Sequence, residues 1–271
     1  MILMCQTLRI NIIMYIKCLP ALSDNYIFVV QNFKDKTSVV IDPANYRVVL
    51  DYLKKSRTRL VAILNTHHHQ DHIGANKKLI EQFPYVSIYG SEQDKGRIPG
   101  QNHYLREGDQ FNFANKNAEI FFIPGHTNGH IAYYFPPNSH QETGELFCGD
   151  TLFAGGCGRL FEGTAEQMYN SLIKLRTLPN KTRIWCSHEY TVNNLKFALT
   201  IEKDNHNLLL RYDKVINLRK NNQATIPSFL QEEKETNPFL RCDYPSLRKI
   251  FKTNNPIEVF KKIRQLKDNF S

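Results

Sequence analysis

Four histidines and one aspartate fall within six consecutive residues of the stretch THHHQDHIGA. Imidazole nitrogens and carboxylate oxygens are ligands that proteins offer to zinc, iron and manganese. Side chains two residues apart in extended backbone point the same way, so His67 and His69 can converge while His68 faces elsewhere. Asp71 and His72 follow at the turn into a helix, whose N-terminus favours a carboxylate. The stretch therefore predicts part of a metal site.

Three further strand patterns end on side chains of the same kind. The apolar run LVAILN predicts a buried strand directly before the histidine-rich stretch. EIFFIPG leads to His126, ELFCG leads to Asp150, and RIWCS leads to His188. We expect these four strands to belong to one buried sheet that collects the side chains at one edge, as α/β folds do.

The seven side chains collected in this way exceed the four ligands that a tetrahedral zinc ion takes. They suit two ions that share a carboxylate, and Asp150 is the natural bridge. Two such cations would hold a water between them and lower its pKa toward neutrality, which gives a hydroxide nucleophile at physiological pH. Nitrogen and oxygen ligands without thiolate admit Zn, Fe or Mn, so the residues do not select the metal.

The elements that must position these residues alternate between strand and helix over the first two thirds of the chain. The predicted strands are YIKCLP, NYIFVVQN, TSVVIDP, LVAILNT, VSIYG, AEIFFIPG, HIAYYF, ELFCGDT and RIWCSHE, and the predicted helices between them are YRVVLDYLKKS, GANKKLIEQF and TAEQMYNSLIKLRTL. This alternation predicts a layered α/β fold with helices packed on sheets. From about Tyr190 the pattern changes to helix and loop. We therefore place an α/β domain at 15–189 and a helical domain at 190–271.

Composition narrows the class of protein. A chain of 271 residues with 41% hydrophobic residues can form one large domain, or one domain with a smaller appendage. Its net charge of +9 favours an anionic partner such as nucleic acid, a lipid surface or an acidic small molecule, although a solvated lysine-rich surface fits equally. Its six cysteines are scattered without a C-x-x-C pair, which predicts reduced thiols in the cytoplasm.

The first residues are apolar but do not predict a signal peptide. Gln6, Arg9 and Asn11 interrupt them, and a basic leading segment and a small-residue cleavage site are missing. Met14 could equally be the true start, so we treat 1–14 as an extension of doubtful translation. No window approaches the roughly 18 uninterrupted apolar residues of a membrane span, and we expect no membrane association.

The order T-H-x-H-x-D-H, G-H-T, G-D and a final histidine resembles the metallo-β-lactamase superfamily, whose fold is an αββα sandwich with a dinuclear site at one edge of the two sheets. The resemblance implies one ion bound by His67, His69 and His126, a second bound by Asp71, His72 and His188, and Asp150 between them. The remaining histidines are expected at the surface or behind the ligands, and these are His68, His103, His130, His140 and His206.

Longer stretches resemble one family of that superfamily, glyoxalase II or hydroxyacylglutathione hydrolase. They are DTLFAGGCGRLFEGTAEQMYNSL, HEY, NPFLR and RQLKDNF, and the resemblance runs from about Tyr15 to the C-terminus. It implies hydrolysis of S-D-lactoylglutathione to D-lactate and glutathione, the second step of methylglyoxal detoxification. It also implies that glutathione is bound by Arg159, Phe161, Tyr190, Arg264 and Lys267. Some members have Lys and Tyr at the first two positions, so Phe161 can pack there but cannot donate a hydrogen bond.

The chemistry of these residues agrees with that implication. Glutathione carries two carboxylates, which arginine binds through a two-pronged contact and lysine as a point charge. Arg264 and Lys267 are three residues apart, hence on one face of the last helix. We expect a metal-bridging hydroxide to attack the thioester carbonyl while one ion stabilises the oxyanion. Asp71 would orient this nucleophile or accept its proton, and the thiolate leaves without a strong acid.

Other activities on the same fold make different demands. A nuclease would use the positive charge, but the sequence has no basic arm or stacking platform, so nucleic acid is not an expected partner. Lactamases commonly differ at the Asp71–His72 and Asp150 positions, and a persulfide dioxygenase would use one iron and consume oxygen. A non-catalytic scaffold would be expected to have lost a ligand, and none is missing. We expect a cytoplasmic monomer whose partner is a glutathione thioester.

Overall fold

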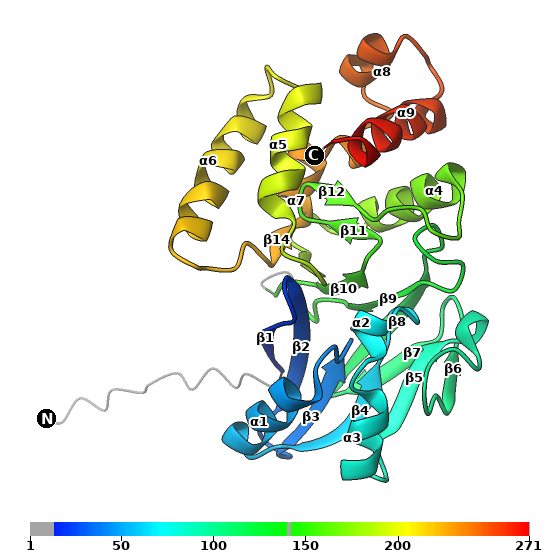
Figure 1. Ribbon diagram of the computed structural model, residues 1–271, viewed down its shortest axis with the longest axis vertical. Helices are drawn as coiled ribbons and strands as arrows, with labels where there is room; N and C mark the ends of the chain where they lie inside the picture. Colours follow the sequence, from blue (N-terminus) through cyan, green and yellow to red (C-terminus); the bar gives the residue numbers. More distant parts are fainter. Residues whose placement is uncertain (1–13, 140–141, 271) are drawn as a thin grey trace, which may run out of the picture.

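Two sheets pack face to face within residues 14–139 and 142–270, the part of the chain that the computed structural model describes (Figure 1). The first sheet runs in the order β1 (Tyr15–Ala21), β2 (Asn25–Asn32), β3 (Thr37–Ile41), β4 (Arg59–Leu64), β5 (Ser87–Ser91) and β6 (His103–Leu105). The second runs in the order β14 (Ser228–Phe229), β13 (Arg183–Cys186), β10 (Glu145–Gly149), β9 (Ile131–Phe135), β8 (Lys116–Phe122) and β7 (Gln110–Phe113). A separate hairpin pairs β11 (Leu152–Phe153) with β12 (Gly156–Cys157). Residues 1–13 and His140 lie outside the described residues, and what we predicted for them stays a prediction.

The side chains of β2 alternate between the two faces of the first sheet. Ile27 and Val29 pack in a cluster with apolar residues of α1 (Tyr46–Ser56) and α3 (Asn76–Gln82). Phe28 and Val30 instead belong to the core shared with the second sheet. Strand geometry sends successive side chains to opposite faces, so one strand serves both layers.

The helix α4 (Ala165–Arg176) packs on the second sheet and completes the layers. It begins with a capping box, in which the Thr164 hydroxyl accepts from the Gln167 backbone N–H and the Gln167 side chain accepts from the Thr164 backbone N–H. Met168, Leu172 and Leu175 are buried on its inner face. The order helix, sheet, sheet, helix confirms the predicted αββα sandwich.

Aromatic rings fill the space between the sheets. The ring of Phe147, on β10, lies 5.5 Å from that of Phe28, on β2, and 6.1 Å from the rings of Phe135 and Trp185. Phe147 is fully buried. Aromatic side chains of this size contribute much of the hydrophobic stabilisation of a core. This cluster therefore packs the two sheets against each other.

The helical region lies at one end of the sandwich (Figure 1). It comprises α5 (Thr191–Ile201), α6 (His206–Lys220), α7 (Leu230–Thr236), α8 (Pro245–Phe251) and α9 (Pro256–Asp268). Proline occupies the first turn of α8 and of α9, where its missing N–H costs no helical hydrogen bond. The region also returns to the sandwich, because β14 pairs with β13. A boundary near residue 190 stays a prediction.

Some elements differ from the sequence prediction. The stretch GANKKLIEQF was predicted as a helix, and α3 lies within it, but the structure has a separate short helix, α2 (Gln70–Ile73), where only a turn was predicted. Gly74 lies between the two helices, and a Cβ added there would lie 2.8 Å from the Gln70 carbonyl oxygen. The short elements β6, β7, β14 and α8 were not predicted, because they are too short to show a clear hydrophobic period.

The helices and the cysteines can be compared with what the sequence predicted for membrane spans and thiols. Among the helices of residues 14–139 and 142–270, none combines the length and the apolar character that crossing a bilayer requires. Within the same residues the thiols are free, and these are Cys18, Cys148, Cys157, Cys186 and Cys242.

Replacing Phe147 by alanine is expected to lower the free energy of unfolding by about 3–5 kcal/mol, because the buried ring leaves a cavity between the sheets. The same change at Tyr85, which is 96% exposed, is expected to stay within about 0.5 kcal/mol. Urea unfolding of the metal-loaded proteins measures both. Equal losses in the two variants would contradict the packing described here.

Candidate metal centre and substrate cavity

The predicted metal ligands converge from both sheets. His67 and His69 follow β4 of the first sheet, and Asp71 and His72 lie on α2 directly after them. The other three, which are His126, Asp150 and His188, follow β8, β10 and β13. These strands run parallel in the second sheet, so their carboxyl ends meet at one edge. The expectation of a single sheet is therefore wrong, and the site lies where the edges of two sheets meet.

The first group of ligands consists of His67, His69 and His126. One nitrogen of each ring lies within 4.8 Å of the others, and His126 Nε2 is 3.0 Å from His69 Nδ1. Burial, followed by the neighbouring His72 and His130, holds the pKa of His67 well below its usual value. Burial and His126 lower the pKa of His69 to about 4. These rings are therefore neutral at physiological pH, the state in which imidazole binds a metal.

The second group consists of Asp71, His72 and His188. Asp71 Oδ2 lies 3.3 Å from His72 Nε2 and 3.4 Å from His188 Nε2. Burial alone would lower the pKa of His188, but Asp150 and Asp71 raise it to about 10. Burial also opposes charge on Asp71, yet the adjacent His188 and His72 rings hold its pKa below the usual range. Without metal, His188 is therefore protonated and Asp71 is ionised, so the group contains a positive and a negative charge.

Asp150 contacts both groups. Its Oδ1 lies 3.4 Å from His72 Nε2, and its Oδ2 lies 3.4 Å from both His126 Nε2 and His188 Nε2. Burial opposes its charge, but His72 and His188 outweigh that cost and hold the pKa of Asp150 well below its usual value. A buried, ionised carboxylate between two sets of imidazoles is the arrangement that a bridging ligand requires.

Three buried atoms of this centre make no hydrogen bond to any residue that the structure describes. They are His67 Nε2, His72 Nε2 and Asp150 Oδ1. Leaving buried polar atoms unpaired is costly, so such atoms call for a ligand. Cations coordinated by nitrogen and oxygen would satisfy all three. The two groups of donors around one carboxylate indicate a dinuclear metal site.

In three of the ligand imidazoles, the ring nitrogen that points away from the centre contacts a neighbouring oxygen. His72 Nδ1 lies 3.0 Å from Asp42 Oδ2, and His188 Nδ1 lies 2.7 Å from Asp24 Oδ1. His126 Nδ1 lies 2.8 Å from the Arg159 carbonyl oxygen. Partners of this kind set the ring orientation and raise the basicity of the ligand.

Asp42 could itself be taken for a ligand, because its carboxylate lies near His67 and His72. Its oxygens are already occupied, however. They accept from the Thr66 backbone N–H at 2.8 Å and the Thr66 hydroxyl at 2.7 Å, besides contacting His72. Asp42 therefore orients the ligands rather than binding an ion.

Sequence reasoning did not find the residues behind the ligands. Asp42 ends the predicted strand TSVVIDP in the same way that Asp150 ends its strand, and that likeness was a usable signal. Asp24 lies in the turn between β1 and β2, and Asn25 begins β2, where only three-dimensional contact reveals a role. His130 matches its expected place behind the ligands, since its Nε2 accepts from the Asp150 backbone N–H at 3.1 Å.

A cavity of about 370 Å³ opens beside the metal ligands. All five predicted substrate residues line it together with two metal ligands, and these are Arg159, Phe161, Tyr190, Arg264, Lys267, His126 and Asp150. The structure therefore brings together residues from the sandwich and from α9, more than a hundred positions apart. A cavity that joins a metal site to several cations can bind an anionic molecule next to reactive groups.

The aromatic residues of this cavity lie against the ligands. The Phe161 ring is 5.2 Å from that of His126 and 61% exposed. The Tyr190 ring stacks on that of His188, with centroids 4.8 Å apart. Burial, followed by the nearby Asp24, raises the pKa of Tyr190, so its hydroxyl keeps its proton and can donate a hydrogen bond.

The two cations of α9 differ in their surroundings. Arg264 is buried, and its Nη1 donates to the Cys157 carbonyl oxygen at 2.9 Å while its Nη2 lies 2.9 Å from Asp268. Lys267 is half-buried, and burial, followed by the charge of Arg264, lowers its pKa to about 8. Arg264 is therefore occupied by contacts within the protein, and Lys267 is the more available of the two to bind an anion.

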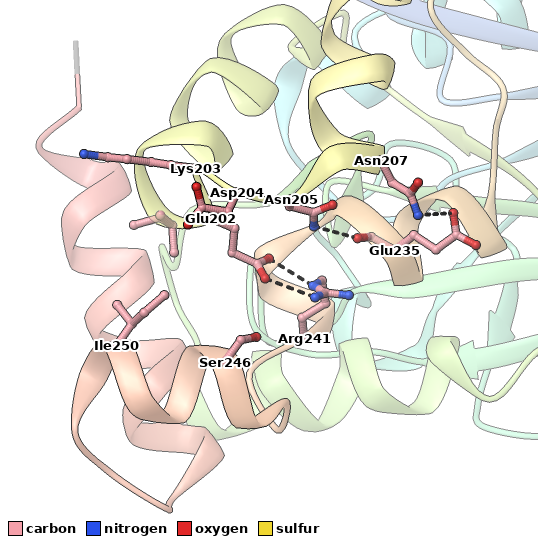
Figure 2. A pocket seen from close by; sticks show the side chains of 10 residues that line it. Glu202, Lys203, Asp204, Asn205, Asn207, Glu235, Arg241, Ser246 and Ile250 are labelled. Atoms are coloured by element: carbon pink, nitrogen blue, oxygen red, sulfur yellow. Dashed lines mark hydrogen bonds and ion pairs between the residues drawn. The ribbon is translucent and has the colours of Figure 1, made fainter.

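A second cavity, of about 490 Å³, lies within the helical region (Figure 2). An ion pair and a hydrogen bond join residues of its lining. Arg241 donates to both carboxylate oxygens of Glu202, at 2.9 and 3.0 Å, and Asn205 donates to the Glu235 carbonyl oxygen at 2.9 Å. Its walls include none of the predicted metal ligands. It therefore offers no counterpart of the chemistry at the first cavity.

Known proteins resemble this chain over most of its length. A model of the metallo-beta-lactamase superfamily matches residues 21–188, and a model of the hydroxyacylglutathione hydrolase C-terminus matches residues 189–270. A hydroxyacylglutathione hydrolase of Crocosphaera subtropica is 61% identical over 257 residues, which cover 95% of this chain and all of that protein.

Solved structures show the same fold. ETHE1 from Myxococcus xanthus has a TM-score of 0.66 at 23% identity, covering 93% of this chain and 90% of that one. TTHA1623, solved in a di-iron-bound form, has a TM-score of 0.51 at 26% identity, covering 64% of this chain and 91% of that one.

Loading the metal-free protein with Zn²⁺ at pH 7 is expected to release about two protons or more per chain. The pKa of His72 and that of His188 lie above neutrality without metal, and an ion binds only the neutral rings. The release should shrink as the pH rises toward 10, because the rings then lose their protons before the ion arrives. A pH indicator in weakly buffered solution measures it. Loading at pH 7 without any release would contradict the assigned charges.

Proposed function

We infer the site chemistry from one premise, that the chain belongs to the hydroxyacylglutathione hydrolase family within the metallo-beta-lactamase superfamily. It is an enzyme that hydrolyses the thioester of S-2-hydroxyacylglutathiones, with S-D-lactoylglutathione as substrate, to a 2-hydroxy acid and glutathione. This is the second step of methylglyoxal detoxification. The observation that supports this location for the activity is a single cavity whose lining includes proposed metal ligands and also cationic side chains.

We assign the ligands of the two ions as follows. The first takes His67, His69 and His126, the second takes Asp71, His72 and His188, and Asp150 serves both. When bound, such ions polarise a thioester carbonyl and make hydroxide available at neutral pH. Zinc is our first choice, and the same donors admit iron or manganese. The di-iron-bound form of TTHA1623 supports a dinuclear site on this fold.

Asp71 has a second role in this proposal, since its carboxylate is only partly buried. Its side chain is 38% exposed, and Asn25 Nδ2 donates to its Oδ2 at 2.9 Å. Its low pKa makes it a weak proton acceptor. Asp71 therefore orients the attacking water through a hydrogen bond rather than taking its proton. The glutathione thiolate needs no strong acid to leave.

The glutathione end of the substrate lies against the cations and Tyr190. Arg159 and Lys267 bind the two glutathione carboxylates, because each is a cation on the cavity wall with a group that can reach an anion. Tyr190 donates a hydrogen bond to the peptide, and Phe161 packs against it. Arg264, already bound to Cys157 and Asp268, shapes the wall and adds positive potential.

We also propose a cytoplasmic monomer. The described cysteines are free and mostly buried, as in proteins of reducing compartments. The domain division at residue 190 belongs to this proposal as well, with the metal ligands on one side and α9 on the other.

The activity is tested by the loss of thioester absorbance of S-D-lactoylglutathione. The metal-loaded enzyme should turn it over, and both a chelated sample and Asp150→Ala should fall by about a hundredfold or more, because metal catalysis is lost. Turnover that survives in the chelated sample would contradict the metal-dependent proposal. Absence of turnover with two bound ions would contradict the substrate.

Lys267→Ala is expected to raise KM about tenfold with little change in kcat, since it removes a cation that binds remote from the thioester. Lys261→Ala, an exposed lysine on the same helix, is the control and should leave KM unchanged. The lysine loses its charge as the pH rises through its pKa of about 8. KM of the parent enzyme should therefore rise between about pH 7 and pH 9, and steady-state kinetics should show no such rise in Lys267→Ala.

A further inference from the structure

The stretch from Phe153 to Gly158 joins the metal ligand Asp150 to the cavity residue Arg159. It forms the β11–β12 hairpin, and Phe153 and Cys157 line the substrate cavity. Its strands face each other over two pairs of residues, which cannot hold the hairpin in place alone, because isolated hairpins are marginally stable in water. Its position must therefore come from neighbouring elements.

Side chains of the helical region bind the polar backbone atoms of this hairpin one after another. Asn237 Nδ2 donates to the carbonyl oxygens of Phe153 (3.3 Å) and Gly156 (2.9 Å). Asn194 Nδ2 donates to the carbonyl oxygen of Ala154 (3.2 Å), and Arg264 Nη1 donates to that of Cys157 (2.9 Å). Glu233 Oε2 accepts from the Gly155 N–H (2.8 Å). These partners come from α5, the α7 helix and its C-terminal end, and α9.

Glu233 is the charged member of this set and is fully buried. Its Oε1 pairs with Arg211, which is 4% exposed, while its Oε2 also accepts from Asn237 Nδ2 at 3.2 Å. A buried ion pair gains little stability, because both charges lose their hydration. Its use here is a charged acceptor for the Gly155 N–H, since such hydrogen bonds are stronger than neutral ones.

Gly155 itself requires this support. Its φ of +69° lies in the left-handed region, and an added Cβ would meet Leu195 of α5 at 2.6 Å. The turn is thus pressed against the helices with no room for a side chain. The helical region defines where the hairpin lies.

We propose that Glu233 and Asn237 are positioning residues for the substrate cavity. They hold the hairpin so that Phe153 and Cys157 form its wall, while Arg211 balances the charge of Glu233. This inference rests on the proposed glutathione site. It adds that the helical region shapes the part of the cavity that the sandwich contributes, besides supplying Lys267.

The metal ligand next to the hairpin is held separately. The Asp150 backbone N–H donates to His130 Nε2 at 3.1 Å, and the Thr151 hydroxyl donates to the Ile123 carbonyl oxygen at 3.3 Å. Both partners belong to the sandwich. Loosening the hairpin should therefore change the binding of substrate and leave the metals in place.

The test uses Glu233→Gln and Asn237→Ser in the full-length, metal-loaded enzyme. Serine can keep the cap on the Phe239 N–H that Asn237 Oδ1 now makes, but it loses the hydrogen bonds that Asn237 Nδ2 donates to Phe153, Gly156 and Glu233. We expect KM for S-D-lactoylglutathione to rise about tenfold in each, since small displacements of a binding wall have large effects. We expect kcat within about twofold and unchanged metal content. Amide hydrogen exchange of residues 152–158 should become faster.

Glu202→Gln is the matched control. It breaks the ion pair with Arg241 (Figure 2), which lies in the same helical region and lines the second cavity. It should lower the melting temperature while KM and exchange of residues 152–158 stay at parent values. Equal effects in the control, or parent KM and exchange in both test variants, would overturn the proposal. A parent enzyme without thioesterase activity would instead refute the proposed function, and the exchange measurement would still decide the role of the two residues.

Discussion

The whole arrangement depends on one buried charge, the carboxylate of Asp150. It lies within 3.4 Å of ring nitrogens of His72, His126 and His188, which come from segments that follow strands of both sheets. A buried carboxylate is costly unless cations and hydrogen-bond donors surround it. The positive charge that this carboxylate requires comes from imidazoles that converge on it from several strand ends, and from the two ions that it would hold.

Further layers of the structure keep those side chains in place. Asp42 and Asp24 fix the far nitrogens of His72 and His188, so the ligands are oriented before any ion binds. Outside them, the helical region holds the hairpin that follows Asp150 and supplies α9 to the cavity. The residues that orient these two metal-ligand rings thus differ from the residues that hold the hairpin.

The sequence predicts those parts that depend on local spacing. His67 and His69, two apart in extended backbone, converge as expected, and the long apolar strands lie where the pattern placed them. The assignment of the ligand-bearing strands to one sheet was wrong, because strand pairing over long separations leaves no mark in local periodicity. The contacts of Arg264 with Cys157 could not be foreseen for the same reason, since they join residues more than a hundred positions apart.

The central claim is that two ions held through Asp150 carry the hydrolysis. The most direct test titrates metal-free enzyme with zinc and follows turnover of S-D-lactoylglutathione against ions bound per chain, counted by native mass spectrometry. We predict that activity follows the species with two ions and reaches its plateau when that species is complete. Full activity in the species with one ion, or in the metal-free chain, would contradict the account.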